Sequence, residues 1–165
     1  MKTAILKISV FLLLFSLMGA GCEKEENGYS NLVEGYIVGT FICDQIDKKS
    51  GEATSNKTQR GYCILLKNSE NKTSPYPMDF YTFDFSDNPF VIPDEALSPN
   101  FNGNNCGPNF FPDNLRNVYE VKFKYQILNE FDESQFVCGS CTAMELVFPW
   151  DDYSQIKLKD ITINN

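Results

Sequence analysis

Residues 119–127, Tyr-Glu-Val-Lys-Phe-Lys-Tyr-Gln-Ile, alternate between apolar and polar side chains. Side chains that repeat every second residue share one face of a β-strand, so this stretch predicts a strand with one dry and one wet face. It is the clearest periodic signal in the chain. It indicates that the folded part belongs to the all-β class.

Further strands are predicted on both sides of this stretch, over residues 33–43, 61–67, 78–85, 135–138, 142–148 and 155–163. Residues 61–67, Gly-Tyr-Cys-Ile-Leu-Leu-Lys, form a continuous apolar run, which is typical of a strand buried on both faces. In the last strand the apolar side chains change phase between Leu158 and Ile161, which predicts a bulge near Lys159 and Asp160. Residues 44–59 are polar and predict a long hairpin loop.

A proline-rich crossing interrupts the strands over residues 86–117, with prolines at positions 89, 93, 99, 108 and 112. Regular strands do not tolerate that density of proline, although Pro93–Leu97 could form one helical turn. Three strands, a long crossing and two or three more strands follow the order of an OB-like Greek-key barrel. A small β-sandwich is the alternative. We expect a single β-domain over residues 32–165.

The N-terminus has the pattern of an export signal. Lys2 and Lys7 precede a short apolar run that ends at Gly19-Ala20-Gly21-Cys22. A basic start, a short apolar stretch and small residues at the end characterise a secretory signal peptide, and this run is too short to span a bilayer. We expect a signal peptide over residues 1–21 and a polar tether over residues 22–31.

The cysteine directly after the small residues resembles the lipobox of bacterial lipoproteins, although Gly19 stands where that family usually has leucine. The resemblance implies that Cys22 is lipidated and becomes the first residue of the mature chain. The following Lys24, Glu25 and Glu26 resemble the export signal of bacteroidete surface lipoproteins. That resemblance implies a protein anchored by lipid in the outer membrane and displayed at the cell surface.

Composition restricts the remaining function classes. Removal of residues 1–21 takes two lysines and no acids, which leaves 12 basic and 22 acidic side chains and a formal charge of −10. This charge disfavours nucleic acid as a partner. The chain has no histidine, which excludes serine–histidine and cysteine–histidine catalysis. We expect no enzymatic activity, no cofactor and no metal site.

Five cysteines follow Cys22, and outside the cytoplasm they are candidates for disulfides. We expect Cys63 to be the unpaired, buried thiol because it lies in the apolar run 61–67. We expect Cys106 to pair with Cys138 or Cys141, and Cys43 to take the remaining partner. A redox dithiol at Cys138-Gly139-Ser140-Cys141 is an alternative, but the residues that follow predict a strand rather than the helix that activates such pairs.

Three aromatic residues lie in proline-containing stretches instead of strand interiors: Phe110, Phe111 and Trp150. Such residues can contact a glycan or a protein partner, or they can close the ends of a barrel. We therefore expect a non-catalytic contact domain, with an unknown surface protein or glycan as its partner. A glycan-binding component and an extracytoplasmic thiol–disulfide protein are the alternatives.

Overall fold

The computed structural model describes residues 28–47, 50–69, 76–85, 92, 107–137 and 148–163. Seven strands in these ranges form one sheet: β1 (Val33–Ile46), β2 (Ala53–Leu66), β3 (Phe80–Thr82), β4 (Asn109–Phe110), β5 (Glu120–Ile127), β6 (Phe136–Val137) and β7 (Ser154–Ile163). Two short 3-10 helices accompany them, η1 (Lys67–Ser69) and η2 (Trp150–Asp152). The chain is thus all-β, as predicted.

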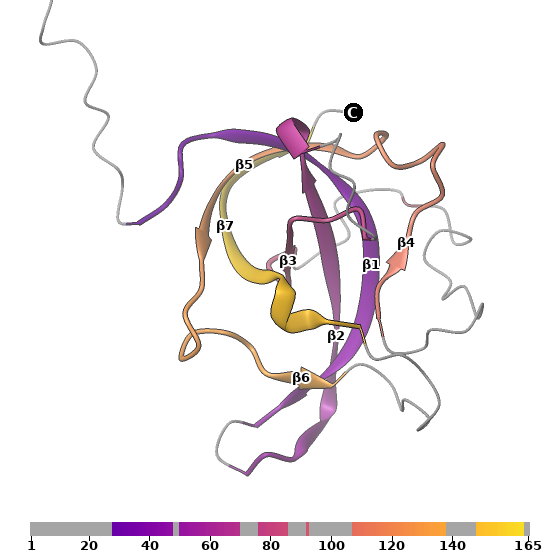
Figure 1. Cartoon of the computed structure of the whole chain (residues 1–165). Coiled ribbons are helices and arrows are strands. Elements are labelled where there is room, and N and C mark those ends of the chain that lie inside the picture. Colours follow the sequence, from indigo (N-terminus) through magenta and orange to yellow (C-terminus); the bar gives the residue numbers. More distant parts are fainter. Residues whose placement is uncertain are drawn as a thin grey trace, which may run out of the picture.

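Five of the strands close into a barrel (Figure 1). Around the barrel the order is β1, β2, β3, β7 and β5, and β5 pairs with β1 to complete the ring. The pairs are antiparallel except β3 with β7, which run parallel. This is the predicted OB-like Greek-key barrel and not the alternative sandwich. The short strands β4 and β6 lie outside the ring and pair with β1.

Apolar side chains from all five ring strands fill the barrel interior. The interior cluster contains Ile37 of β1, Ile64 of β2, Phe123 of β5 and Ile156 of β7, with Phe80 of β3 packed against it. Ile127 at the end of β5 is exposed, but the alternation predicted for residues 119–127 is confirmed over Tyr119, Val121 and Phe123, which are all buried. Their burial removes large apolar surfaces from water, which is the main stabilising contribution to a fold of this kind.

A second cluster covers the outer face of β1, β2 and β3. It takes the alternate side chains of these strands, including Val38, Cys63 and Tyr81, and adds Phe148 from outside the ring. Residues 61–65 are therefore buried on both faces, as the continuous apolar run predicted. The sheet is covered here because the chain between β5 and β7 contributes aromatic residues to this side.

Two local predictions have clear outcomes. The bulge near Lys159 and Asp160 is confirmed, because the β5–β7 register shifts there and Asp160 has a φ of 54°. The predicted loop over residues 44–59 is wrong for most of its length. β1 continues to Ile46 and β2 begins at Ala53, so the two strands form a hairpin that extends beyond the barrel. Polar side chains do not prevent pairing there, since the ladder hydrogen bonds are made by the backbone.

The other strand predictions differ in extent. Of the predicted strand 78–85, only Phe80–Thr82 forms a strand. The predicted strand 135–138 corresponds to β6. The predicted helical turn at 93–97 and most of the predicted strand 142–148 lie outside the described residues. Ser30 lies within the predicted tether, residues 22–31, but it is attached to the barrel: its N–H donates to Tyr125 O at 2.7 Å, and its Oγ accepts from Tyr125 N–H at 3.0 Å.

Candidate functional site

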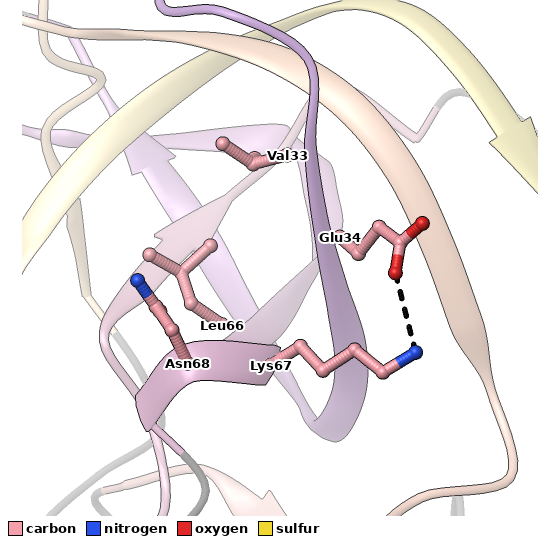
Figure 2. Close-up of a pocket in the computed structure, with 5 residues that line it drawn as sticks. All are labelled: Val33, Glu34, Leu66, Lys67 and Asn68. Atoms are coloured by element: carbon pink, nitrogen blue, oxygen red, sulfur yellow. Dashed lines mark hydrogen bonds and ion pairs between the residues drawn. The ribbon is translucent and has the colours of Figure 1, made fainter.

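A pocket of about 420 Å³ opens at the end of the barrel where β1 begins and β2 runs into η1. Five residues line it: Val33, Glu34, Leu66, Lys67 and Asn68. Figure 2 shows the side chains of Val33, Leu66 and Asn68 on one side of β1, while Glu34 and Lys67 meet on the other. Val33 and Leu66 also pack against the interior cluster, so the pocket has an apolar floor that continues into the barrel core.

The strand pairing brings these residues together. Gly35 is opposite Leu66 in the β1–β2 ladder, and a Cβ at Gly35 would lie 2.8 Å from Leu65 O. Only glycine permits so close a backbone approach at this point. The backbone N–H of Leu66 donates to Asp79 Oδ2 at 2.9 Å, which holds the end of β2 where the chain turns into η1.

Charged side chains form a network along the rim. Lys67 Nζ lies 3.2 Å from Glu34 Oε2 and 3.2 Å from Glu120 Oε1. Lys122 Nζ pairs with the other oxygen of Glu34. The network contains two lysines and two glutamates, so its formal charge is balanced. These four side chains are partly exposed, and such pairs contribute little stability in water.

The electrostatics of the rim disfavour acid–base chemistry. Hydrogen bonds from Lys122 and Lys67 hold the pKa of the Glu34 carboxyl below its ordinary value. Hydrogen bonds to Glu34 and Glu120 raise the pKa of Lys67 to about 12. Glu34 is therefore ionised and Lys67 protonated at neutral pH, whereas an efficient general acid or base has a pKa near the working pH. The pocket can hold an apolar group beside a charge-balanced rim, but its side chains offer no activated nucleophile.

The three aromatic residues predicted as ligand contacts separate into two groups. Phe111 is buried against the interior cluster, where its ring packs edge-to-face on Tyr119 at 5.5 Å. Phe110 and Trp150 join the outer-face cluster, and both contact Phe148, at centroid distances of 6.2 Å and 4.8 Å. The structure thus brings Phe110 and Trp150 together and places Phe111 on the other side of the sheet.

Trp150 has a packing role that its sequence context does not reveal. Its ring contacts Phe41 at 4.7 Å, Phe136 at 5.1 Å and Tyr81 at 5.2 Å. In OB folds the face of strands 2 and 3 is a common ligand-binding surface. Here Phe136 and Trp150 from the chain between β5 and β7 pack on Tyr81 of β3, so the chain's own aromatic residues occupy part of that surface.

Two acidic residues that flank β3, Asp79 before it and Asp84 after it, accept hydrogen bonds from the backbone of neighbouring strands. Asp79 accepts from the backbone of Leu66, as described above, and Asp84 Oδ2 accepts from the backbone N–H of Leu158 at 2.6 Å. Asp84 thereby connects the segment after β3 to β7.

The cysteines have distinct states. Cys63 is free and fully buried, as predicted, and burial raises its pKa well above the ordinary value. Cys43 is buried on β1 and is disulfide-bonded. Cys106, Cys138 and Cys141 lie outside the described residues, so their pairing stays a prediction. Cys22, Lys24, Glu25 and Glu26 also lie outside them.

Reasoning from the sequence missed the pocket and its rim. The alternation in residues 119–127 does predict that Glu120 and Lys122 share the polar face of one strand, so two of the four charged residues in the network could be placed together from the sequence. Their partners, Glu34 and Lys67, are far away in sequence. They reach the same rim only because β1 pairs with both β2 and β5.

No protein-family model, curated protein or solved structure matches this chain. In the described part of the chain, no helix is long and apolar enough to cross a membrane. Conclusions about function therefore depend on the chain's own residues.

Proposed function

We propose that this protein is a surface lipoprotein, anchored in the outer membrane by acyl chains on Cys22, whose non-catalytic barrel makes contacts outside the cell. The observation that carries this proposal is the basic, then apolar N-terminus that ends at Gly19-Ala20-Gly21-Cys22. Buried acyl chains contribute about 0.8 kcal/mol per methylene group, and more than one chain makes attachment durable.

The attachment of the first described residues to β5 supports a barrel held close to the membrane. Six residues separate Cys22 from Tyr29, and Ser30 is already hydrogen-bonded to β5. A chain of seven residues spans at most about 25 Å when fully extended. An anchor at Cys22 would therefore leave the barrel little freedom to move away from the lipid headgroups.

The pocket chemistry supports a contact role instead of catalysis. Glu34 and Lys67 hold their charges over a wide range around neutral pH, and they satisfy each other. The chain has no histidine that could serve as a general base. Contact surfaces need shape and apolar area, and they do not need a titrating group.

Replacement of the lipid-bearing residue tests the anchor. Cys22→Ala should move the protein from the membrane fraction to the soluble fraction and abolish incorporation of a labelled fatty acid. Cys63→Ala is the matched control, because it removes a cysteine that is free and buried. The proposal is wrong if the Cys22→Ala protein stays in the membrane fraction.

Protease treatment of whole cells tests surface display. The wild-type barrel should be degraded, and simultaneous replacement of Lys24, Glu25 and Glu26 by alanine should protect it inside the cell. Replacement of the exposed Asp151 and Asp152 by alanine is the control for a general loss of acidic charge. Equal degradation of all three proteins would contradict a role for residues 24–26 in export.

Glycan binding is a second candidate function, favoured by the partly exposed Phe110 and Trp150 in one aromatic cluster. Sugar rings stack on aromatic faces that are open to solvent. Trp150 already packs against other aromatic rings of the chain, which leaves less of it available for a ligand. Quenching of Trp150 fluorescence by oligosaccharides would support this function over the proposed one.

A further inference from the structure

The outward side of β5 and β7 differs in charge from the rest of the protein. Together the two strands contain two acids and four lysines, namely Lys122, Lys124, Lys157 and Lys159. Their formal charge is +2, whereas residues 22–165 as a whole carry −10. Basic side chains of an acidic protein are therefore concentrated on one side of the barrel, which we call the lysine face.

Strand alternation directs all four lysines away from the core. Four other side chains of these strands are buried in the interior cluster: Val121, Phe123, Ile156 and Leu158. The lysines alternate with them and so face outward. In the β5–β7 ladder Lys124 lies directly opposite Lys159, and like charges in this position destabilise a sheet. This pair is better explained by a contact outside the chain than by the stability of the barrel.

Neighbouring acids compensate only part of this charge. Lys122 Nζ pairs with Glu34, and Lys124 Nζ lies 3.2 Å from Asp160 Oδ2 at the bulge. At the edge of the face, the pocket rim adds Glu34 and Lys67, whose charges are equal and opposite. The lysine face therefore keeps its net positive charge when its edge is included.

The N-terminal segment crosses the lysine face before it enters β1. A Cβ at Gly28 would lie 3.4 Å from Gln126 Nε2, so the chain passes over the outward side of β5. Lys159 Nζ lies 5.6 Å from the centroid of the Tyr29 ring, which is a cation–π contact with β7. Ser30 then hydrogen-bonds to β5. In Figure 1 the indigo segment accordingly leaves the barrel on the side of β5 and β7.

The length of chain before this segment limits how the barrel can turn. Seven residues lead from Cys22 to Tyr29, and they span at most about 25 Å. A domain of this size is roughly 35 Å across. An anchor at Cys22 therefore keeps the lysine face nearer to the membrane than β2, which lies across the ring from β5 and β7.

Two exposed aliphatic side chains border the lysine face. Leu32 precedes Val33, which is opposite Phe123, so Leu32 lies beside Lys124 on the outward side. Ile161 lies in the bulge of β7 and is also exposed. Basic and aliphatic side chains on one face are typical of surfaces that bind anionic membranes.

We propose that the lysine face lies against the anionic phosphate groups of the lipids around the anchor. This inference rests on the proposed function, because an acylated Cys22 is what brings the face to a membrane. An anionic surface attracts lysines that lie within about one Debye length, and it repels the acidic remainder of the barrel. β2 and the hairpin it forms with β1 are then turned away from the membrane.

Chemical labelling of the full-length lipoprotein tests this orientation. The purified protein, with its acyl chains verified by mass spectrometry, is inserted into preformed vesicles of phosphatidylcholine, alone or in equal parts with phosphatidylglycerol. A membrane-impermeant active ester then acetylates lysines, and a carbodiimide couples glycinamide to carboxylates. Lys157, which is exposed, should react roughly fivefold more slowly on the anionic vesicles, the factor expected for one lysine at an anionic surface. Exposed Glu52, at the tip of the β1–β2 hairpin, should react equally on both.

A matched pair of charge reversals identifies the face responsible. Lys157→Glu should abolish the slower labelling of Lys159 on anionic vesicles, whereas Arg116→Glu makes the same charge change outside the two strands and should leave it. High salt should also abolish the difference, because it screens the attraction. Equal labelling of Lys157 on both kinds of vesicle would overturn the proposal, as would equal effects of the two variants.

Flotation of the vesicles separates this inference from the anchor. A protein that floats with both kinds of vesicle while Lys157 stays fully reactive refutes the orientation and leaves the anchor intact. A protein that does not float refutes the proposed anchor, and the orientation with it.

Discussion

Gly61 on β2 is a position where one methyl group should disturb the whole outer-face cluster. An added Cβ would lie 2.1, 2.4 and 2.6 Å from three carbon atoms of the Phe41 ring. Ordinary contacts between carbon atoms are about 3.5–4.0 Å, so the ring would have to move by roughly 1.5 Å. Phe41 is buried and has aromatic neighbours on several sides, including Phe83 at 5.3 Å and Trp150 at 4.7 Å.

The expected cost of Gly61→Ala is a balance of two effects. Overpacking a buried site costs about 1–3 kcal/mol, and each aromatic contact that is lost costs roughly 0.5–1.5 kcal/mol more. Alanine is better than glycine in a strand by about 0.5–1 kcal/mol, which offsets part of this loss. We expect the free energy of unfolding to fall by about 2 kcal/mol. With a slope of about 2 kcal/mol per molar urea, the unfolding midpoint would fall by about 1 M.

A double-mutant cycle with Phe41→Leu isolates the steric cause. Leucine removes the ring that the new methyl group would meet, so Gly61→Ala should be neutral or slightly stabilising in that background. The coupling free energy between the two sites should be about 2 kcal/mol. The reasoning is refuted if Gly61→Ala is as stable as the wild type, or if it costs the same in both backgrounds.

Three further predictions concern single side chains. Cys63 is buried and its raised pKa keeps it as the thiol, so an aromatic disulfide reagent should modify it only after denaturant is added; rapid modification of the folded protein would contradict this. Burial, with smaller contributions from Glu133 and Asp151, raises the pKa of Tyr81 from 10.0 to about 12, so its contribution to stability should be complete below pH 10 and lost as the pH rises toward 12. Urea unfolding from pH 8 to 12 should show a shallower alkaline decline for Tyr81→Phe, and identical slopes would refute the assignment. At the bulge, Asp160 has a φ of 54°, a conformation that β-branched residues adopt poorly; Asp160→Val should lower the unfolding free energy by about 1–2 kcal/mol while Asp160→Gly should not, and equal effects would argue against backbone strain.

Several elements could be predicted from the local sequence because buried side chains recur at every second residue of a strand. The alternation in residues 119–127 identified β5 and its dry face, since each side chain's position follows from that of its neighbour two residues away. The phase change between Leu158 and Ile161 located the bulge for the same reason. The apolar context of Cys63 was enough to predict a buried thiol.

Other features were decided by contacts between segments that are far apart in sequence. The hairpin beyond the barrel is stabilised by backbone pairing between β1 and β2, so the polarity of residues 44–59 gave no sign of it. The parallel pairing of β3 with β7 closes the ring. It joins only Phe80 and Tyr81 to Ser154 and Gln155, and so short a pairing produces no recognisable pattern in the sequence.

The same limit applies to the candidate site. Neighbouring aromatic residues, Phe110 and Phe111, have opposite environments because consecutive side chains next to a strand point to opposite faces, and only the tertiary structure determines what covers each face. Lys67 reaches both Glu34 and Glu120 because β1 lies between β2 and β5. The N-terminal signal, by contrast, is a linear pattern that can be recognised without the fold. The sequence alone therefore predicts export and lipid anchoring, whereas only the tertiary structure defines the pocket.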